Sequence, residues 1–303
     1  MKSFFVRLLA ILIMAALMLS LVACTNAPQR QKKITEMFDS FPKSDQYILA
    51  LKDKILMGDK EIDLNSVTYN GKRCSLIVVE EKGAYAYFRS GEAENALGIV
   101  YISYNPMEIQ LLTTVENFPY VINTEYCEGQ LYFRISDSEN KGNQLYYVYD
   151  VSTGESVYVD TNQMPDDFER SADHHRSAVY TMQRGFNDSE NYLTVTKKET
   201  GETKTIDNSL IGTCEEGKQI LAMAKGAELG TGCSTAYEKN GDIYVLFLYV
   251  TDGFLGSPCH YYILKYDFEN HCMEYYTSVF FDDYPSILDL YIPQPESAMS
   301  SVE

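Results

Sequence analysis

The sequence predicts an all-β fold built from repeated units of antiparallel strands. The 303 residues include 25 tyrosines and 14 phenylalanines, and valine, isoleucine and threonine fill short alternating runs, a composition that favours strands over helices. A pattern of two consecutive strands recurs along most of the chain. Thr-Gly-Glu sequences beginning at Thr153 and Thr200 place glycine where a tight hairpin needs a positive φ.

A cleaved lipoprotein signal is expected over residues 1–23. The positively charged Lys2 and Arg7 flank an apolar run, Leu8–Ala23, which ends at Cys24. This run of 16 residues is shorter than the roughly 20 that a membrane-spanning helix needs. The sequence Leu-Val-Ala-Cys ending at Cys24 resembles the bacterial lipobox. The resemblance implies a diacylglycerol thioether on Cys24 and anchoring at the extracytoplasmic face of the cell membrane; an ordinary secretory signal is the alternative.

Two segments separate the anchor from the repeats. Residues 24–33 are polar and suit a lipidated tether. In the N-terminal segment, residues 34–71, apolar side chains from Tyr47 to Ile55 recur at helical spacing, and Gly58 would end such a helix. First strands, with one over Tyr47–Leu51 and a turn near Gly58, fit the same residues, because so short a run does not distinguish the two periods.

From Lys72 onward a unit of strands repeats, and this repeat decides the fold class. Each unit has a strand with a central tyrosine and then a strand that closes on a polar turn; the tyrosines are Tyr87, Tyr132, Tyr180 and Tyr244. Successive tyrosines lie 45, 48 and 64 residues apart, so we expect an insertion in the last interval, within Glu215–Asn240. Several strands per repeat of this length are typical of β-propeller blades, which bury their faces by packing around a common axis.

The runs GQLYFRIS…NQLYYVYDVSTGESVYV and GDIYVLF…YYILKYDFENHCMEYYTSV resemble the degenerate propeller repeats of bacterial surface lipoproteins. Those are akin to the six-bladed propellers of the low-density-lipoprotein-receptor type, although the Tyr-Trp-Thr-Asp signature of the receptor repeats is missing and the chain has no tryptophan. The resemblance, which covers residues 72–279, implies a β-propeller-like domain over 72–293 with four recognisable blades and five or six possible. Residues 294–303 are expected to form a disordered tail.

Charge and cysteine content limit the partners and cross-links. The formal net charge is −18, and removal of Lys2 and Arg7 with the signal makes it more negative, so we expect no nucleic-acid partner. Membrane contact is therefore expected through the lipid on Cys24. Six further cysteines allow fifteen disulfide connectivities, and their pairing stays open. They are Cys74, Cys127, Cys214, Cys233, Cys259 and Cys272.

No motif assigns a catalytic residue, a cofactor site or a metal site. The run Asp173-His174-His175 is the densest cluster of possible ligands, but it supplies two on one strand face, and a zinc site would need a third from His260 or His271. Residues 137–142 begin like a calcium loop, yet Val148 stands where the bidentate glutamate belongs. We therefore expect neither a metal nor a cofactor.

The favoured function is binding: a propeller scaffold that presents its loops or its channel mouth to a protein or a small ligand. The alternative is an anchored enzyme acting on glycans or peptides, with carboxylates assembled from several blades. Acidic pairs occur at Asp166-Asp167 and Asp282-Asp283, but adjacent carboxylates rarely have the separation that glycoside hydrolysis needs. A transporter's solute-binding protein fits less well, because that class alternates strands with helices.

Overall fold

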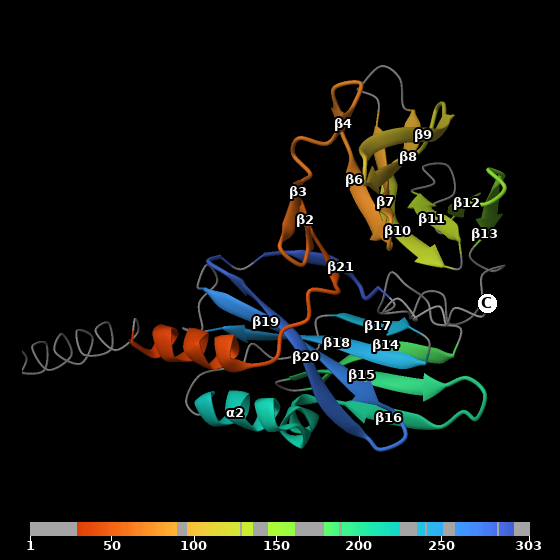
Figure 1. Ribbon diagram of the computed structural model, residues 1–303. Coiled ribbons are helices and arrows are strands. Elements are labelled where there is room, and N and C mark those ends of the chain that lie inside the picture. Colours follow the sequence, from red (N-terminus) through yellow and green to blue (C-terminus); the bar gives the residue numbers. More distant parts are fainter. Residues whose placement is uncertain are drawn as a thin grey trace, which may run out of the picture.

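The structure is a computed structural model, and it describes residues 29–89, 96–127, 129–135, 145–160, 179–187, 190–224, 235–239, 241–250, 258–283 and 285–293. These residues form a five-bladed β-propeller: five antiparallel sheets, each of three or four strands, follow one another along the chain (Figure 1). The predicted all-β propeller fold is confirmed, and the number of blades lies within the expected range of four to six.

Two blades come from continuous chain in the first half of the protein. The first contains β6 (Ser75–Val79), β7 (Gly83–Arg89), β8 (Leu97–Tyr104) and β9 (Met107–Val115). The second contains β10 (Val121–Cys127), β11 (Gln130–Ile135), β12 (Leu145–Asp150) and β13 (Ser156–Asp160). The small hairpin of β4 (Thr68–Tyr69) and β5 (Lys72–Arg73) precedes them.

The next two blades follow the same order. In the third, the described residues supply β14 (Tyr180–Asn187), β15 (Glu190–Lys197) and β16 (Thr203–Ile206). The fourth contains β17 (Thr235–Lys239), β18 (Asp242–Val250), β19 (Cys259–Asp267) and β20 (Cys272–Phe281). One of its two central strands, β19, is buried along almost its whole length, because alternate residues of the strand pack in two different apolar clusters.

The remaining blade joins the two ends of the described chain. Its strand order is β21 (Ile287–Tyr291), β1 (Ile48–Leu51), β2 (Lys54–Met57) and β3 (Lys60–Asp63), with β21 antiparallel to β1. Strands β6 and β10 contact each other, and β21 contacts both β6 and β17, so these first strands line the axis. The last described strand, β21, therefore supplies the inner strand of the blade that β1 to β3 build, and this pairing closes the ring.

This closure settles the two alternatives for the segment from 34 to 71. Residues 48–63 are strands rather than a helix, with Gly58 at φ 58° in the turn between β2 and β3. All four residues of β1 are buried in the apolar core. Such a continuous apolar run shows neither the two-residue period of a half-exposed strand nor a helical period. The propeller accordingly begins at Ile48, earlier than the expected boundary at Lys72.

Tyr87, Tyr132 and Tyr244 lie in the second strand of their blades, and Tyr180 lies in β14, the first described strand of the third blade. The register of the four tyrosines is not uniform. Tyr132 and Tyr244 are equivalent, because each follows a positive-φ glycine, Gly129 or Gly241, by three residues. Tyr132 pairs with Val148 across β11 and β12.

The other two tyrosines are each shifted by two residues. In the second blade the Val151 N–H donates to the Gly129 carbonyl; the Tyr104 N–H donates to Lys82 in the first blade and the Lys198 N–H to Val179 in the third. The residues equivalent to Tyr132 are therefore Tyr85 in the first blade and Met182 in the third. The predicted equivalence of Tyr87 and Tyr180 with Tyr132 was wrong by two residues in each case. A two-residue slip leaves side chains on the same face, so the alternating pattern alone does not define the register.

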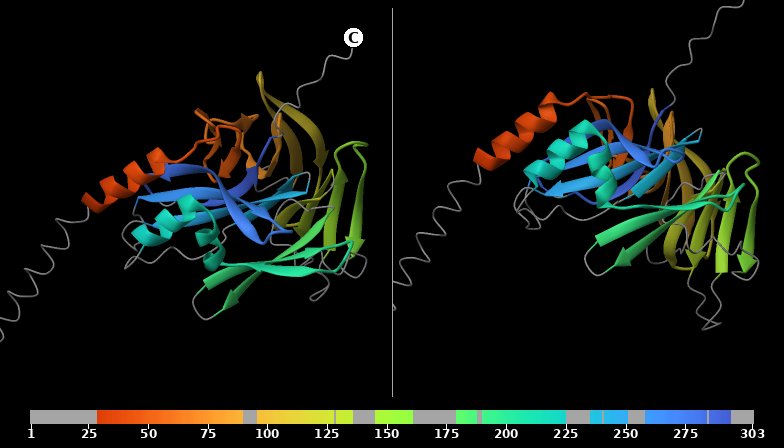
Figure 2. Two further views of the ribbon diagram at one scale, coloured as in Figure 1. Left: turned by 60° about the horizontal axis from the view of Figure 1, so that its bottom comes forward. Right: turned by 90° about the horizontal axis from the view of Figure 1, so that it is seen from below.

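Helices cover the fourth blade on one side (Figure 2). Residues 29–40 are helical, and this N-terminal helix includes the second half of the predicted tether. The short η3 (Asn208–Thr213) and α2 (Glu215–Met223) follow the third blade, and α2 falls in the predicted insertion. The buried Phe38 and Ile220 join the same apolar cluster as Phe247 of β18, so both helices pack on this sheet. None of the helices in the described ranges is long and apolar enough to cross a membrane.

Candidate functional site

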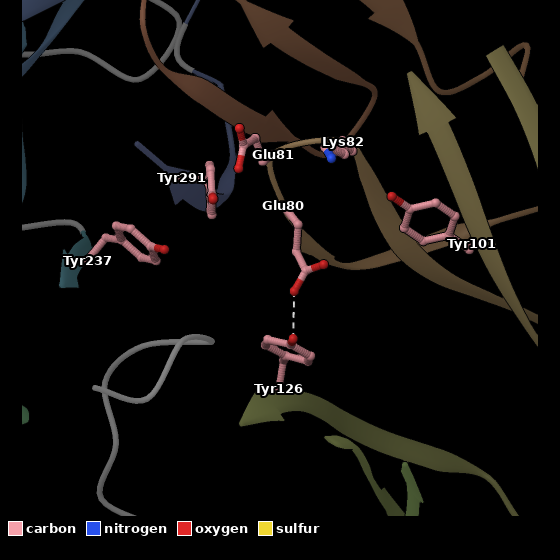
Figure 3. A pocket seen from close by; sticks show the side chains of 7 residues that line it. All are labelled: Glu80, Glu81, Lys82, Tyr101, Tyr126, Tyr237 and Tyr291. Carbon is pink, nitrogen blue, oxygen red and sulfur yellow. Dashed lines mark hydrogen bonds between the residues drawn. The ribbon is translucent and has the colours of Figure 1, made fainter. Parts of the chain in front are cut away.

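A pocket of about 390 Å³, which we call the axial pocket, lies beside three inner strands near the axis (Figure 3). Tyr126 comes from β10, Tyr237 from β17 and Tyr291 from the end of β21. The loop between β6 and β7 and one residue of β8 complete the wall. The lining residues are Glu80, Glu81, Lys82, Tyr101, Tyr126, Tyr237 and Tyr291.

The loop that carries the charged residues is held from two sides. The Glu80 N–H donates to the Gly83 carbonyl at 2.8 Å, which forms the tight connection between β6 and β7. Directly before it, the Val79 N–H donates to the buried carboxylate of Asp289 in β21 at 3.0 Å. Gly83 is required for packing, because a Cβ there would lie 2.4 Å from the ring of Tyr101. The backbone hydrogen bonds therefore hold the loop in place, and the close approach of Gly83 holds the ring of Tyr101.

A hydrogen bond between side chains connects the first and second blades inside the pocket. The Tyr126 hydroxyl donates to Oε1 of Glu80 at 2.5 Å (Figure 3). Short O–H···O⁻ contacts of this kind are typical of a charge-assisted hydrogen bond. Burial and the bond to Glu80 both raise the pKa of Tyr126 above its usual value, so the phenol keeps its proton.

The Glu80 carboxylate also acts on the other phenols nearby. Burial raises the pKa of Tyr101 first, and the charge of Glu80 raises it further. The pKa of Tyr85, behind the pocket wall, is raised to about 12 by burial and then by Glu80. Tyr237 has a raised pKa from burial, with smaller contributions from Tyr291, Asp289, Glu238 and Glu80. The pocket therefore combines neutral phenols with a negative electrostatic potential.

The opposite wall is an aromatic pair from two different blades. The ring centroids of Tyr237 and Tyr291 lie 5.4 Å apart, with their planes tilted by 48°. Both side chains are buried, so their packing holds the rings in place. Since β17 and β21 are far apart in sequence but in contact, this wall exists only in the closed ring.

Several clusters considered from the sequence lie outside the described residues. These are Asp173-His174-His175, Asp166-Asp167, residues 137–142 and the lipidation residue Cys24. Asp282-Asp283 follows the end of β20 and is not among the residues that line the pocket. Within the ranges that the structure describes, no three His, Cys, Asp or Glu side chains gather as a metal site would require.

The two described histidines have structural contacts. His260 in β19 is buried and stacks on Phe38 of the N-terminal helix, with ring centroids 4.2 Å apart. Nδ1 of His271 is 2.7 Å from the Tyr266 hydroxyl. Neither histidine is a third ligand in a site that the structure describes.

Cys74, Cys214, Cys259 and Cys272 carry free thiols in the structure. Burial and then the charge of Asp283 raise the pKa of Cys259 to about 12. The pKa of Cys214 is also raised, mainly by burial. Since a thiolate is the reactive form, the thiols of Cys214 and Cys259 are poor nucleophiles.

The sequence analysis did not identify the pocket residues. Tyr126, Tyr237 and Tyr291 come from three blades, and only the ring brings them together. A local signal did exist: the charged run Glu80-Glu81-Lys82 follows a buried strand end directly.

Comparisons with known proteins show no family for this chain. It matches no protein-family model and no curated protein sequence. Among solved structures, two variants of the apocarotenoid oxygenase of Synechocystis each match with a TM-score of 0.28 and 8% identity, over 78% of this chain and 59% of that chain. The β-propeller domain of the trilobed protease from Pyrococcus furiosus matches with a TM-score of 0.26 and 11% identity, over 69% of this chain and 57% of that chain. This chain therefore spans less than two thirds of each of these structures, and the propeller assignment rests on its own sheet topology.

Proposed function

We propose that this protein is a lipid-anchored, extracytoplasmic binding protein that holds a small ligand in the axial pocket. The observation that carries the proposal is the pocket itself, where Glu80 and tyrosines from four blades meet. Its volume is within the range of small-molecule sites, and its lining combines four tyrosine rings with three charged side chains that can orient a ligand.

Binding suits the chemistry of these residues better than catalysis does. The raised pKa values of Tyr126 and Tyr237 keep both phenols protonated near neutral pH, where an efficient general acid or base would titrate. Glu80 is engaged by the Tyr126 hydroxyl, which orients the carboxylate. Such groups recognise a ligand through directed hydrogen bonds and ring contacts.

The membrane anchor is the second part of the proposal. It rests on the resemblance of the four residues ending at Cys24 to a lipobox and on the apolar run before them. The test is expression of the full chain in a bacterial host, followed by membrane fractionation and mass spectrometry. We expect a mature N-terminus at Cys24 with added acyl mass; Cys24→Ser should abolish both, whereas Cys74→Ser should retain them. A mature N-terminus elsewhere, or no acyl mass, would overturn the anchor.

The pocket is tested with a pair of matched variants. Glu81→Trp places a large ring at the pocket, and Glu108→Trp places the same ring on the exposed strand β9. A library of small amines, sugars and carboxylic acids is screened by thermal shift. We expect at least one compound to stabilise the unmodified domain and the Glu108→Trp variant but not the Glu81→Trp variant. If no compound stabilises the domain, or if every stabilising compound acts equally on the Glu81→Trp variant, the pocket is not the binding site.

A further inference from the structure

We propose that the axial pocket selects organic ammonium ions, in particular methylated amines. This inference rests on the proposed function and assigns a ligand class to the same pocket. Three features support it: the sign of the charge around the pocket, the aromatic walls and the fixed position of Glu80.

The charges at the pocket favour a cationic ligand. Glu80 and Glu81 line it together with a single cation, Lys82. The buried carboxylate of Asp289 lies behind the same loop, bonded to the Val79 N–H. The chain as a whole carries a formal charge of −18, which attracts cations and repels anions over longer distances. An anion at Lys82 would lie beside two carboxylates.

The aromatic lining matches the preference of alkylated ammonium groups. Such a cation is attracted to the negative face of an aromatic ring and loses little hydration when it leaves water. The pocket is lined by Tyr101, Tyr126, Tyr237 and Tyr291. Burial and the charge of Glu80 raise the pKa of the first three phenols, which therefore stay neutral. A volume of about 390 Å³ is far larger than a single metal ion needs and admits a small organic cation.

The pocket is arranged before a ligand arrives. The hydrogen bond from Tyr126 holds the Glu80 carboxylate, and the ring contact between Tyr237 and Tyr291 holds the opposite wall. A site that needs little ordering on binding keeps more of its interaction free energy as affinity. The same rigidity permits discrimination between ligands that differ only in charge.

The experiment compares choline with its uncharged analogue 3,3-dimethylbutanol, which has the same branched shape. Binding to the mature domain is measured by isothermal titration calorimetry at pH 7. We expect choline to bind at least about tenfold more tightly than the neutral analogue, and to bind more weakly as salt rises from about 20 to about 200 mM. Equal binding of the two compounds would overturn the ammonium assignment.

Variants locate the effect in the pocket. Glu80→Gln and Glu81→Gln should each weaken choline binding several-fold, Lys82→Met should strengthen it, and Glu108→Gln on β9 should leave it unchanged. Thermal unfolding of each variant separates loss of binding from loss of fold. Unchanged affinity in Glu80→Gln and Glu81→Gln, with the fold intact, would contradict the proposal.

The two proposals fail in different ways. If choline does not bind but a sugar or a carboxylic acid from the screen does, and Glu81→Trp blocks it, the ligand class is wrong and the binding function stands. If neither choline nor any library compound depends on Glu81, both proposals are wrong.

Discussion

Asp289 in β21 accepts a hydrogen bond from the Val79 N–H in β6, at 3.0 Å and across 210 residues of sequence. Oδ1 of the same carboxylate accepts from the Leu290 N–H at 2.9 Å. The bond to Val79 therefore connects the blade that closes the ring to the next blade, directly below the loop that carries Glu80. Stability of the ring and geometry of the pocket depend on the same buried side chain.

Replacement of Asp289 tests this connection. Asp289→Ala should lower the free energy of unfolding by about 2 to 4 kcal/mol, because it leaves the buried Val79 N–H without its acceptor. Asp289→Asn retains an oxygen acceptor and should cost less. Urea denaturation of the three proteins gives the comparison. Equal stability of the alanine variant and the unmodified protein would show that the bond contributes nothing.

Closure of the ring by β21 predicts a sharp dependence on chain length. A chain that ends at Pro285 loses the pairing of β21 with β1 and the buried side chains of Leu290 and Tyr291. We expect it to lack a cooperative thermal transition. A control chain that ends at Pro293 retains β21 and should unfold cooperatively. Circular dichroism on heating distinguishes the two, and a cooperative transition in the shorter chain would contradict closure by this strand.

His260 predicts a pH dependence of stability. Burial between Phe38 and Phe280 lowers its pKa from 6.5 to about 4; Asp39 acts in the opposite direction and Lys43 in the same direction. Below pH 6.5 the unfolded chain binds a proton that the folded protein does not, so stability falls as the pH drops from about 6.5 to about 4. The loss from this group is about 3 kcal/mol.

The matched variant for this prediction is His260→Phe, which keeps an aromatic ring and removes the titration. Urea denaturation of both proteins at several pH values between 7 and 4 cancels the contributions of the carboxylates that they share. The stability of the unmodified protein should decline relative to that of the variant across this range. If the free energies of unfolding of the two proteins changed with pH in parallel, protonation of His260 would not contribute to the pH dependence.

Gly217 predicts an effect opposite to helix propensity. Alanine is normally better than glycine in a helix, but a Cβ at Gly217 in α2 would lie 1.7 Å from the carbonyl oxygen of Ile211. Gly217→Ala should therefore destabilise the protein by about 2 to 3 kcal/mol. Lys218→Ala on the exposed side of the same helix should change stability by less than about 0.5 kcal/mol. Thermal unfolding of both variants measures the difference.

The repeat could be recognised from sequence because blades are local structures. The β11 sequence QLYFRI alternates between half-buried and buried positions, as its pattern predicts. Neighbouring strands are joined by short turns, so pairs such as β11 with β12 follow from sequence order. The register at Tyr87 and Tyr180 was not recoverable, because a shift of two residues preserves the alternation.

The sequence by itself determined the strand content, the spacing of the blades and the resemblance to a lipobox at Cys24, since each depends on residues close together in the chain. Only the tertiary structure decided that β1 to β3 belong to the propeller, because their inner neighbour β21 lies more than 200 residues away. It alone brought Tyr126, Tyr237 and Tyr291 to one pocket with Glu80. The physical reason is that a propeller buries its inner strands around a common axis, so residues distant in sequence become neighbours only when the ring closes.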